Sequence, residues 1–234
     1  MGMIAALPMY DWPEVQDETD ALWAVIRDAL RKAGIDAPQA LTRETGNLYA
    51  FWRRPGILFT QTCWGPMRDG LEDHVHLIGQ PDYSQVEGGE GECYRSAIVM
   101  RDGEAMPPNV TIEERRDMLA GLRFAYNQPD SMSGYLALKG DLGSLKAFGE
   151  SIPTGGHRAS IRAVAEGRAD FCAIDCKSWD LAKRHEPGAA KLVPIAWTRP
   201  RKGLPYISSR QTSAETVARM RAALLDAGLI LGAS

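Results

Sequence analysis

Asn127-Gln128-Pro129-Asp130-Ser131-Met132-Ser133-Gly134-Tyr135 follows an apolar run and opens a helix-like one, and Thr154-Gly155-Gly156-His157 repeats this arrangement further along the chain. Each stretch therefore places small residues, hydroxyls and unpaired backbone N–H groups at the beginning of a helix. The helix dipole is positive at that end, so both stretches attract anions. Two such helix ends in one half of the chain predict a pocket for phosphate, phosphonate or carboxylate.

The first of these stretches offers several ligand-binding groups. Asn127 lies at the end of a predicted strand, and either Asp130 or Ser131 is a candidate helix cap. The hydroxyls of Ser131 and Ser133 lie beside backbone amides, and Gly134 allows a ligand to approach the backbone closely. Serine and aspartate before a helix are often caps and nothing more, so this alternative stays open.

The second stretch adds an imidazole to a glycine-rich loop. Thr154 precedes two glycines, which leave bare amides beside His157, so we expect this histidine to face an anion. Asp175 follows the apolar run 171–174 and thus ends a strand, where open α/β sheets place ligand contacts. Its charge would repel a bare phosphate unless the ligand also carries a cation, which makes it a specificity element. A solvated or capping aspartate is the alternative.

Strand-like and helix-like runs alternate along the whole chain, which predicts two α/β lobes. The expected strands are 4–7, 57–61, 75–78, 94–100, 122–126, 151–153, 171–174, 192–197 and 205–208, and the expected helices are 19–33, 131–138, 157–166, 178–184 and 213–227. Residues 1–95 and 199–234 form a discontinuous first lobe, and residues 96–198 form an inserted second lobe. Two crossover strands join the lobes, with a ligand cleft between them.

The terminal helices have recognisable apolar stripes. For helix 19–33, Asp17 or Thr19 is the expected cap, and the expected buried residues are Leu22, Val25, Ile26 and Leu30. For helix 213–227, the expected buried residues are Val217, Met220, Leu224 and Leu225. In the loops of the first lobe, Tyr10 and Trp64 are candidates for aromatic contacts with the ligand, although aromatic side chains are more often part of the core.

Composition limits the function classes. The formal net charge of -3 with 24% charged residues does not favour nucleic acid as a partner, and no stretch reaches the about 20 apolar residues of a membrane span. No spacing typical of a metal site or of a common catalytic motif occurs, so we expect neither a metal nor a cofactor. The N-terminal residues show no secretory signal, which as the sequence stands favours a cytoplasmic location.

The chain resembles the phosphonate and phosphite group of solute receptors of ABC transporters. The resemblance lies in Ser131-Met132-Ser133-Gly134, in Thr154-Gly155-Gly156-His157, in Ala173-Ile174-Asp175 and in Leu204-Pro205-Tyr206-Ile207. It implies a type II periplasmic-binding-protein fold, whose two lobes close on a small anion by a hinge motion. A periplasmic location would follow if the given sequence lacks its export signal.

The resemblance also implies roles for individual residues. Ser131, Ser133 and the neighbouring amides would hold phosphoryl oxygens, with Met132 between them in a place where many relatives carry a hydroxyl. His157 would add a hydrogen bond, and Asp175 would meet a cationic group of the ligand. An ABC permease would be the partner. The competing hypothesis is a cytosolic enzyme on the same fold, similar to menaquinone-pathway enzymes, with His157 or Asp175 as general base for a carboxylated aromatic substrate.

Overall fold

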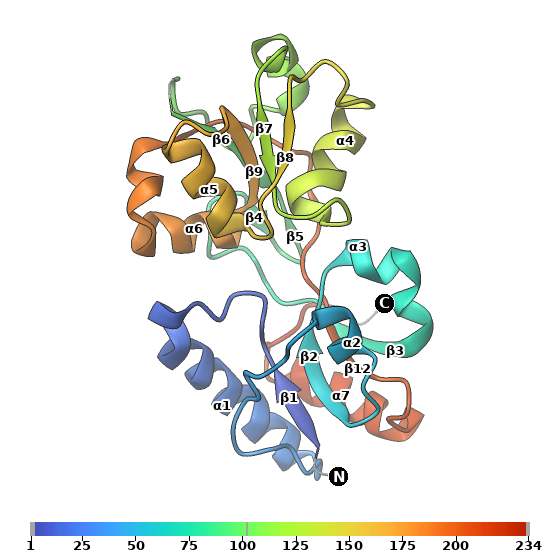
Figure 1. Cartoon of the computed structure of the whole chain (residues 1–234). Coiled ribbons are helices and arrows are strands. Elements are labelled where there is room, and N and C mark those ends of the chain that lie inside the picture. The colour runs from blue at the N-terminus through green and yellow to red at the C-terminus, as the bar shows by residue number, and fades with distance from the viewer. Residues whose placement is uncertain (1–2, 102, 233–234) are drawn as a thin grey trace. The chain divides into compact units, whose positions relative to one another are not determined.

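Two compact units make up the part of the chain that this computed structural model describes, residues 3–101 and 103–232. The first unit runs up to Asp82 and resumes at Lys202, and the second unit is Tyr83–Arg201. In Figure 1 the first unit is blue to cyan and red, and the second is green to orange. Residues 83–95 and 199–201, which the sequence pattern places in the first lobe, lie in the second unit in this division; the domain boundaries stay a prediction.

A four-stranded sheet of order β1-β2-β12-β3 organises the first unit. The elements of this unit are β1 (Ile4–Ala6), η1 (Pro13–Val15), α1 (Gln16–Lys32), α2 (Leu48–Trp52), β2 (Ile57–Gln61), α3 (Trp64–Pro66), η2 (Met67–Leu71), η3 (Glu72–His74), β3 (Val75–Gly79), β12 (Tyr206–Ser209) and α7 (Ala214–Asp226). β1 and β2 are parallel, whereas β12 is antiparallel to both β2 and β3. The predicted return of the chain as a strand of this unit is therefore confirmed.

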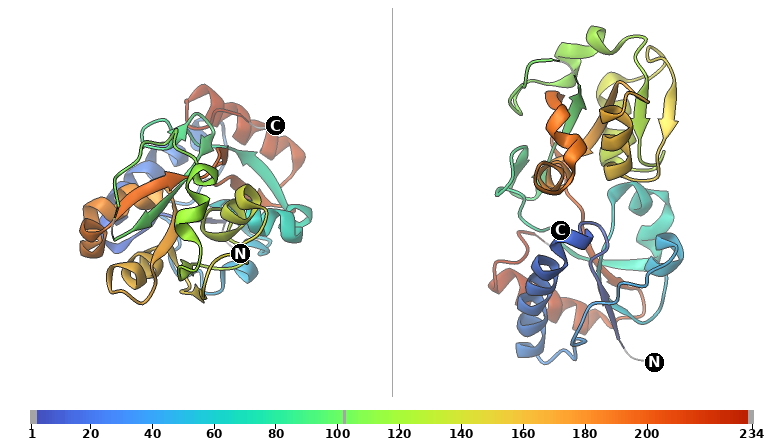
Figure 2. Two further views of the ribbon diagram at one scale, coloured as in Figure 1. Left: turned by 90° about the horizontal axis from the view of Figure 1, so that it is seen from above. Right: turned by 60° about the vertical axis from the view of Figure 1, so that its left-hand side comes forward.

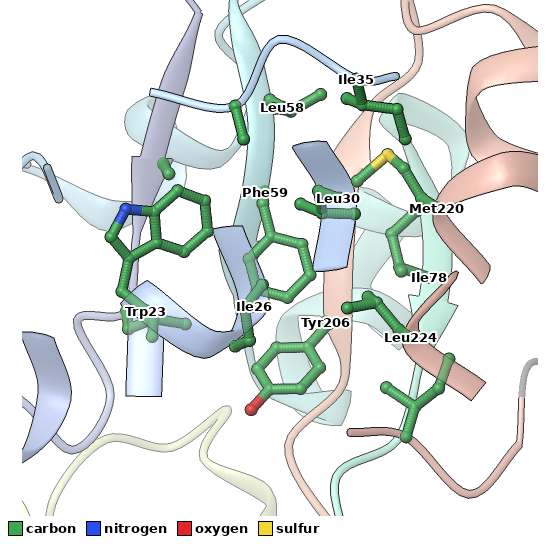
Figure 3. Close-up of a cluster of buried hydrophobic side chains, with 14 of the residues drawn as sticks. Trp23, Ile26, Leu30, Ile35, Leu58, Phe59, Ile78, Tyr206, Met220 and Leu224 are labelled. Atoms are coloured by element: carbon green, nitrogen blue, oxygen red, sulfur yellow. The ribbon is translucent and has the colours of Figure 1, made fainter. Parts of the chain in front are cut away.

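The main core of this unit is formed by the sheet together with helices α1 and α7 (Figure 3). Trp23, Ile26 and Leu30 are almost fully buried there, at the spacing i, i+3 and i+7 that aligns side chains on one helical face. The prediction for Leu22 and Val25 is wrong, because they are 41% and 55% exposed. The large indole of Trp23 occupies the core in place of Leu22. The buried face of α1 therefore includes Trp23, and Leu22 lies outside it.

Both terminal helices also differ in detail from the prediction. α1 begins at Gln16, directly after the turn η1, so its cap position is Val15 and neither Asp17 nor Thr19 caps it. Ser213 caps α7 by accepting a hydrogen bond from the Thr216 amide at 3.2 Å. In α7, Leu225 is 42% exposed, since the buried positions of that helix are Val217, Met220 and Leu224.

A five-stranded mixed sheet of order β10-β6-β9-β7-β8 organises the second unit. Its elements are β4 (Gly89–Glu90), β5 (Cys93–Tyr94), β6 (Ser96–Met100), η4 (Ile112–Leu119), β7 (Phe124–Tyr126), η5 (Met132–Leu136), α4 (Ala137–Leu142), β8 (Ser151–Pro153), α5 (His157–Ala165), β9 (Phe171–Asp175), α6 (Cys176–His185), η6 (Pro187–Lys191) and β10 (Val193–Trp197), with β11 (Arg201–Lys202) at the boundary. The predicted single strand 94–100 is wrong, because it is broken at Arg95 into β5 and β6.

The central strand β9 brings the predicted site segments together. It is parallel to β7 and antiparallel to β6. Phe171 and Ala173 face a core that includes Leu138 and Leu142 of α4, whereas α5 and α6 lie on the other face of the sheet (Figures 1 and 2). Because β7 and β9 run in parallel, their carboxyl ends, which carry Asn127 and Asp175, lie at the same edge. None of the described helices has the length and apolar content needed to cross a membrane.

An ion pair fixes the beginnings of β7 and β9 side by side. Asp170 accepts hydrogen bonds from the Arg123 backbone amide at 2.8 Å and from its guanidinium at 2.8 and 3.1 Å. The bonds from the Arg123 side chain lower the pKa of Asp170 from 3.8 to about 2. They outweigh the partial burial of the carboxyl group, which acts in the opposite direction.

We expect Asp170→Asn to lower the free energy of unfolding by about 1–2 kcal/mol at neutral pH, since charge-assisted hydrogen bonds are lost at a partly exposed site. A folded-state pKa below the unfolded one stabilises the protein above the unfolded pKa. The difference between the wild type and Asp170→Asn should therefore shrink as the pH falls from about 4 to about 2. Urea unfolding across this range measures it, with Asp28→Asn as control because Asp28 is 67% exposed in its pair with Arg27.

Candidate functional site

The first predicted stretch begins a continuous helical run, from Met132 through η5 and α4 to Leu142. Ser131 is its cap, because the Ser131 Oγ accepts a hydrogen bond from the Gly134 amide at 3.1 Å. Of the two predicted caps, Ser131 is thus confirmed and Asp130 is wrong. Ser131 is 8% exposed and Ser133 is 3% exposed, so both hydroxyls lie in surroundings where a hydrogen bond contributes more than in water.

Gly134 is required by the side chain that faces it. A methyl group on its Cα would lie 1.9 Å from Asn127 Oδ1, far inside the van der Waals distance. The backbone oxygen of Asn127 in turn accepts a hydrogen bond from the Gly155 amide at 2.9 Å. The side chain of Asn127 therefore packs against Gly134 of its own stretch, and its carbonyl binds Gly155 of the second stretch.

The second stretch is fixed to strand β7 by Thr154. Its backbone amide and its hydroxyl both donate to the carbonyl of Tyr126, at 2.8 and 3.0 Å. The Thr154 hydroxyl also lies 2.6 Å from the hydroxyl of Ser160, in the first turn of α5. The hydroxyl of Thr154 thus orders the loop before α5, and its predicted contact with a ligand stays a prediction.

His157, the first residue of α5, is where the two stretches meet. Its Nε2 lies 2.9 Å from Ser133 Oγ and 3.5 Å from Asn127 Nδ2. The same nitrogen lies 3.2 Å from Asp175 Oδ2, with side chains 14% and 3% exposed for His157 and Asp175. The structure therefore brings Asn127, Ser133, His157 and Asp175 together within one unit.

Asp175 has a structural role beside its contact with His157. It is the cap of α6, whose Ser178 amide donates to Asp175 Oδ1 at 2.9 Å. Burial favours the neutral acid, but the hydrogen bonds from His157 and Ser178 outweigh it, so the pKa of Asp175 lies below its usual value. A carboxylate paired in this way repels an approaching anion less than an unpaired one, which weakens the repulsion that the sequence alone predicts.

The contacts of Nε2 determine what Ser133 can offer. A ring nitrogen with a lone pair would be repelled by the carboxylate of Asp175, so Nε2 carries a hydrogen. Ser133 Oγ can then only accept from Nε2, and its own hydroxyl hydrogen is directed elsewhere. This leaves the hydroxyl hydrogen of Ser133 for a partner other than His157 Nε2.

Serine, histidine and aspartate also form catalytic triads, but the geometry here is different. In a triad the base uses one ring nitrogen for the serine and the other for the aspartate. Here Ser133 and Asp175 approach the same nitrogen of His157, while Nδ1 is buried and has no hydrogen-bond partner among the described residues. The imidazole therefore cannot relay a proton from Ser133 toward Asp175.

Met132, Tyr10 and Trp64 are the remaining predicted ligand residues. Met132 is 2% exposed. Tyr10 is half-buried in the turn after β1, and Trp64 packs beside Met67 at the beginning of α3; both belong to the first unit. Their contribution to a ligand site stays a prediction.

Known proteins resemble the chain in both sequence and structure. A family model described as "ABC transporter, phosphonate, periplasmic substrate-binding protein" matches residues 73–229. No curated protein sequence matches the chain. The matched region includes every member of the cluster around His157.

Solved structures match almost the whole chain at low sequence identity. PhnD1 from Prochlorococcus marinus in complex with methylphosphonate has a TM-score of 0.69 at 14% identity, covering 96% of this chain and 84% of that one. A binding protein component of an ABC phosphonate transporter from Pseudomonas aeruginosa has a TM-score of 0.66 at 16% identity, covering 94% and 73%. A mutant of ArgBP from T. maritima has a TM-score of 0.60 at 13% identity, covering 96% and 89%. These likenesses show an α/β, periplasmic-binding-protein-like fold with mixed sheets.

Proposed function

The chain belongs to the family of periplasmic substrate-binding proteins of ABC phosphonate transporters, and from this we propose that it captures a small oxyanion of the phosphate, phosphite or phosphonate class for ABC-type uptake. The observation that carries the proposal is the 2.9 Å contact between Ser133 and His157, which joins the beginnings of two helical runs at one place. Both beginnings present backbone N–H groups that attract negative charge.

The chemistry of the cluster supports an oxyanion as the ligand. Ser133 keeps a hydroxyl hydrogen for a ligand oxygen, and the amides of Met132 and Ser133 supply further donors without the loss of side-chain entropy. Asp175 already accepts hydrogen bonds from Ser178 and His157. Its predicted contact with a cationic group of the ligand is part of the proposal, and it would distinguish aminophosphonates from simple ones.

We propose that the chain binds its ligand without converting it. The family consists of transporter binding proteins. In addition, Ser133 and Asp175 contact the same nitrogen of His157, whereas a serine nucleophile and the aspartate of a triad contact different nitrogens of the histidine base. The permease of an ABC transporter is the proposed partner, and the periplasm is the proposed location.

Thermal unfolding with a panel of ligands tests this function. We expect methylphosphonate, phosphite or phosphate to stabilise the protein, whereas sulfate and benzoate should not. A ligand at 100 times its dissociation constant adds about 2.7 kcal/mol, and each kcal/mol raises the melting temperature by about 2–4 °C in a chain of this size. Stabilisation by benzoate alone, or a ligand whose ³¹P spectrum changes on incubation with the protein, would instead favour the enzyme hypothesis.

A further inference from the structure

Helix α6 carries a buried carboxylate at each end, and both reach across to helix α5. Asp175 at its beginning contacts His157. Glu186, at its end, accepts hydrogen bonds from Arg158 Nε at 2.7 Å and Arg162 Nε at 2.9 Å. Arg158 Nη2 also donates to the His185 carbonyl at 3.1 Å. The first two turns of α5 are therefore attached to both ends of α6.

Glu186 follows the last residue of α6 and is also the N-cap of η6, so the dipoles of the two helices act on its charge in opposite directions. A negative side chain at the carboxyl end of a helix is opposed by the helix dipole, and Glu186 is only 6% exposed. The two arginines and the Gly188 amide, which donates to Glu186 Oε1 at 3.3 Å, offset these costs. The sequence alone does not predict the contacts of Glu186 with Arg158 and Arg162, because these arginines lie in α5 and are separated from Glu186 by β9 and α6.

We propose that Glu186 is a positioning residue of the anion site, which holds the beginning of α5 through Arg158 so that His157 stays in register with Ser133 and Asp175. The inference rests on the proposed function. Arg158 follows His157 directly, so a displaced Arg158 moves the backbone that carries the imidazole. The guanidinium fork of Arg158 fits this role because it engages the carboxylate and the His185 carbonyl in fixed directions.

In Glu186→Gln, the lost charge and the lost positioning change the affinity for the anion in opposite directions, so the variant distinguishes the two effects. Removal of a negative charge from the unit that holds the anion would favour anion binding, and a loss of global stability alone would leave the affinity of the folded protein unchanged. Displacement of His157 from Ser133 and Asp175 would weaken anion binding. Removal of outer partners of a ligating histidine typically costs about 10- to 100-fold in metal sites, and we expect about tenfold weaker methylphosphonate binding here.

The experiment compares dissociation constants for methylphosphonate by calorimetry, at a temperature where each variant is folded. Glu186→Gln is matched by Glu166→Gln, since Glu166 is 56% exposed in its pair with Arg168. Arg158→Lys keeps the charge but loses the fork, and Arg168→Lys is its control. We expect weaker binding in Glu186→Gln and Arg158→Lys and wild-type binding in both controls.

Two outcomes would overturn the inference, and they are distinguishable. If the wild type binds methylphosphonate, phosphite or phosphate but Glu186→Gln and Arg158→Lys bind as tightly or more tightly, Glu186 has no positioning role and the proposed function stands. If the wild type binds none of these anions, the proposed function fails and the inference fails with it. Should Glu186→Gln not fold, Arg158→Lys decides alone, because it leaves Glu186 with Arg162.

Discussion

His157→Ala is expected to abolish the stabilisation that a phosphonate or phosphite gives the wild type. The imidazole joins the two helix beginnings through Ser133 and is attached to the sheet through Asp175. At a ligand concentration that adds about 2.7 kcal/mol to the wild type, the variant should show no shift, which corresponds to a loss of about 5–10 °C in the ligand-induced change of melting temperature.

The same substitution should also destabilise the ligand-free protein. It removes a partner of the nearly buried Asp175, and breaking such a pair typically costs about 3–5 kcal/mol. His157→Ala combined with Asp175→Asn removes the buried charge together with its partner and should recover part of this loss, without recovering ligand binding. His74→Ala serves as control, because His74 is exposed at the end of η3 in the first unit. A full ligand shift in the double variant would exclude His157 from the site.

Gly134→Ala is expected to disturb both stability and binding. The new methyl group would lie 1.9 Å from Asn127 Oδ1, so either the side chain of Asn127 or the start of η5 must move. Overpacking of this kind costs about 1–3 kcal/mol, which exceeds the gain of up to about 1 kcal/mol in helix propensity. Because the displaced segment carries Ser133, ligand affinity should fall as well. Urea unfolding and calorimetry measure the two effects.

A matched control and a compensating variant accompany Gly134→Ala. In Gly140→Ala, on α4, the methyl group would lie 3.2 Å from Arg201 Nη2, which is far less close than in Gly134→Ala, so the loss of stability should be smaller. Asn127→Ala with Gly134→Ala removes the atom that clashes, and it should be more stable than the sum of the two single changes predicts. Additive effects in this cycle would show that the contact between Asn127 and Gly134 does not explain the glycine.

Much of the architecture is predictable from local patterns. The strands at 57–61 and 171–174 are short apolar runs between turn residues, and the structure has them as β2 and β9. The return of the chain into the first sheet as β12 follows from the apolar residues after Pro205. The buried face of α1 is predicted less well, because periodicity alone does not distinguish Leu22 from Trp23 when both neighbour the core stripe.

The candidate site is predictable in its residue types but not in its contacts. The serines, glycines and histidine before two helices indicate an anion site. Sequence cannot show that Ser133 and Asp175 share one nitrogen of His157, since this depends on the alignment of β7 with β9 and on the rotation of α5. It also cannot show that the hydroxyl of Thr154 is engaged with Ser160, or that Glu186 holds Arg158, because these are contacts between side chains of packed elements.

We propose that the start of η5 and the start of α5 together hold one oxyanion. Titration of the ¹⁵N-labelled protein with methylphosphonate, followed by amide chemical shifts, tests it most directly. We predict saturable shifts with a single dissociation constant at Ser133 and Gly134 and, at the same ligand concentrations, at His157 and Arg158. Saturable binding that leaves these amides unmoved while shifting others would contradict the account.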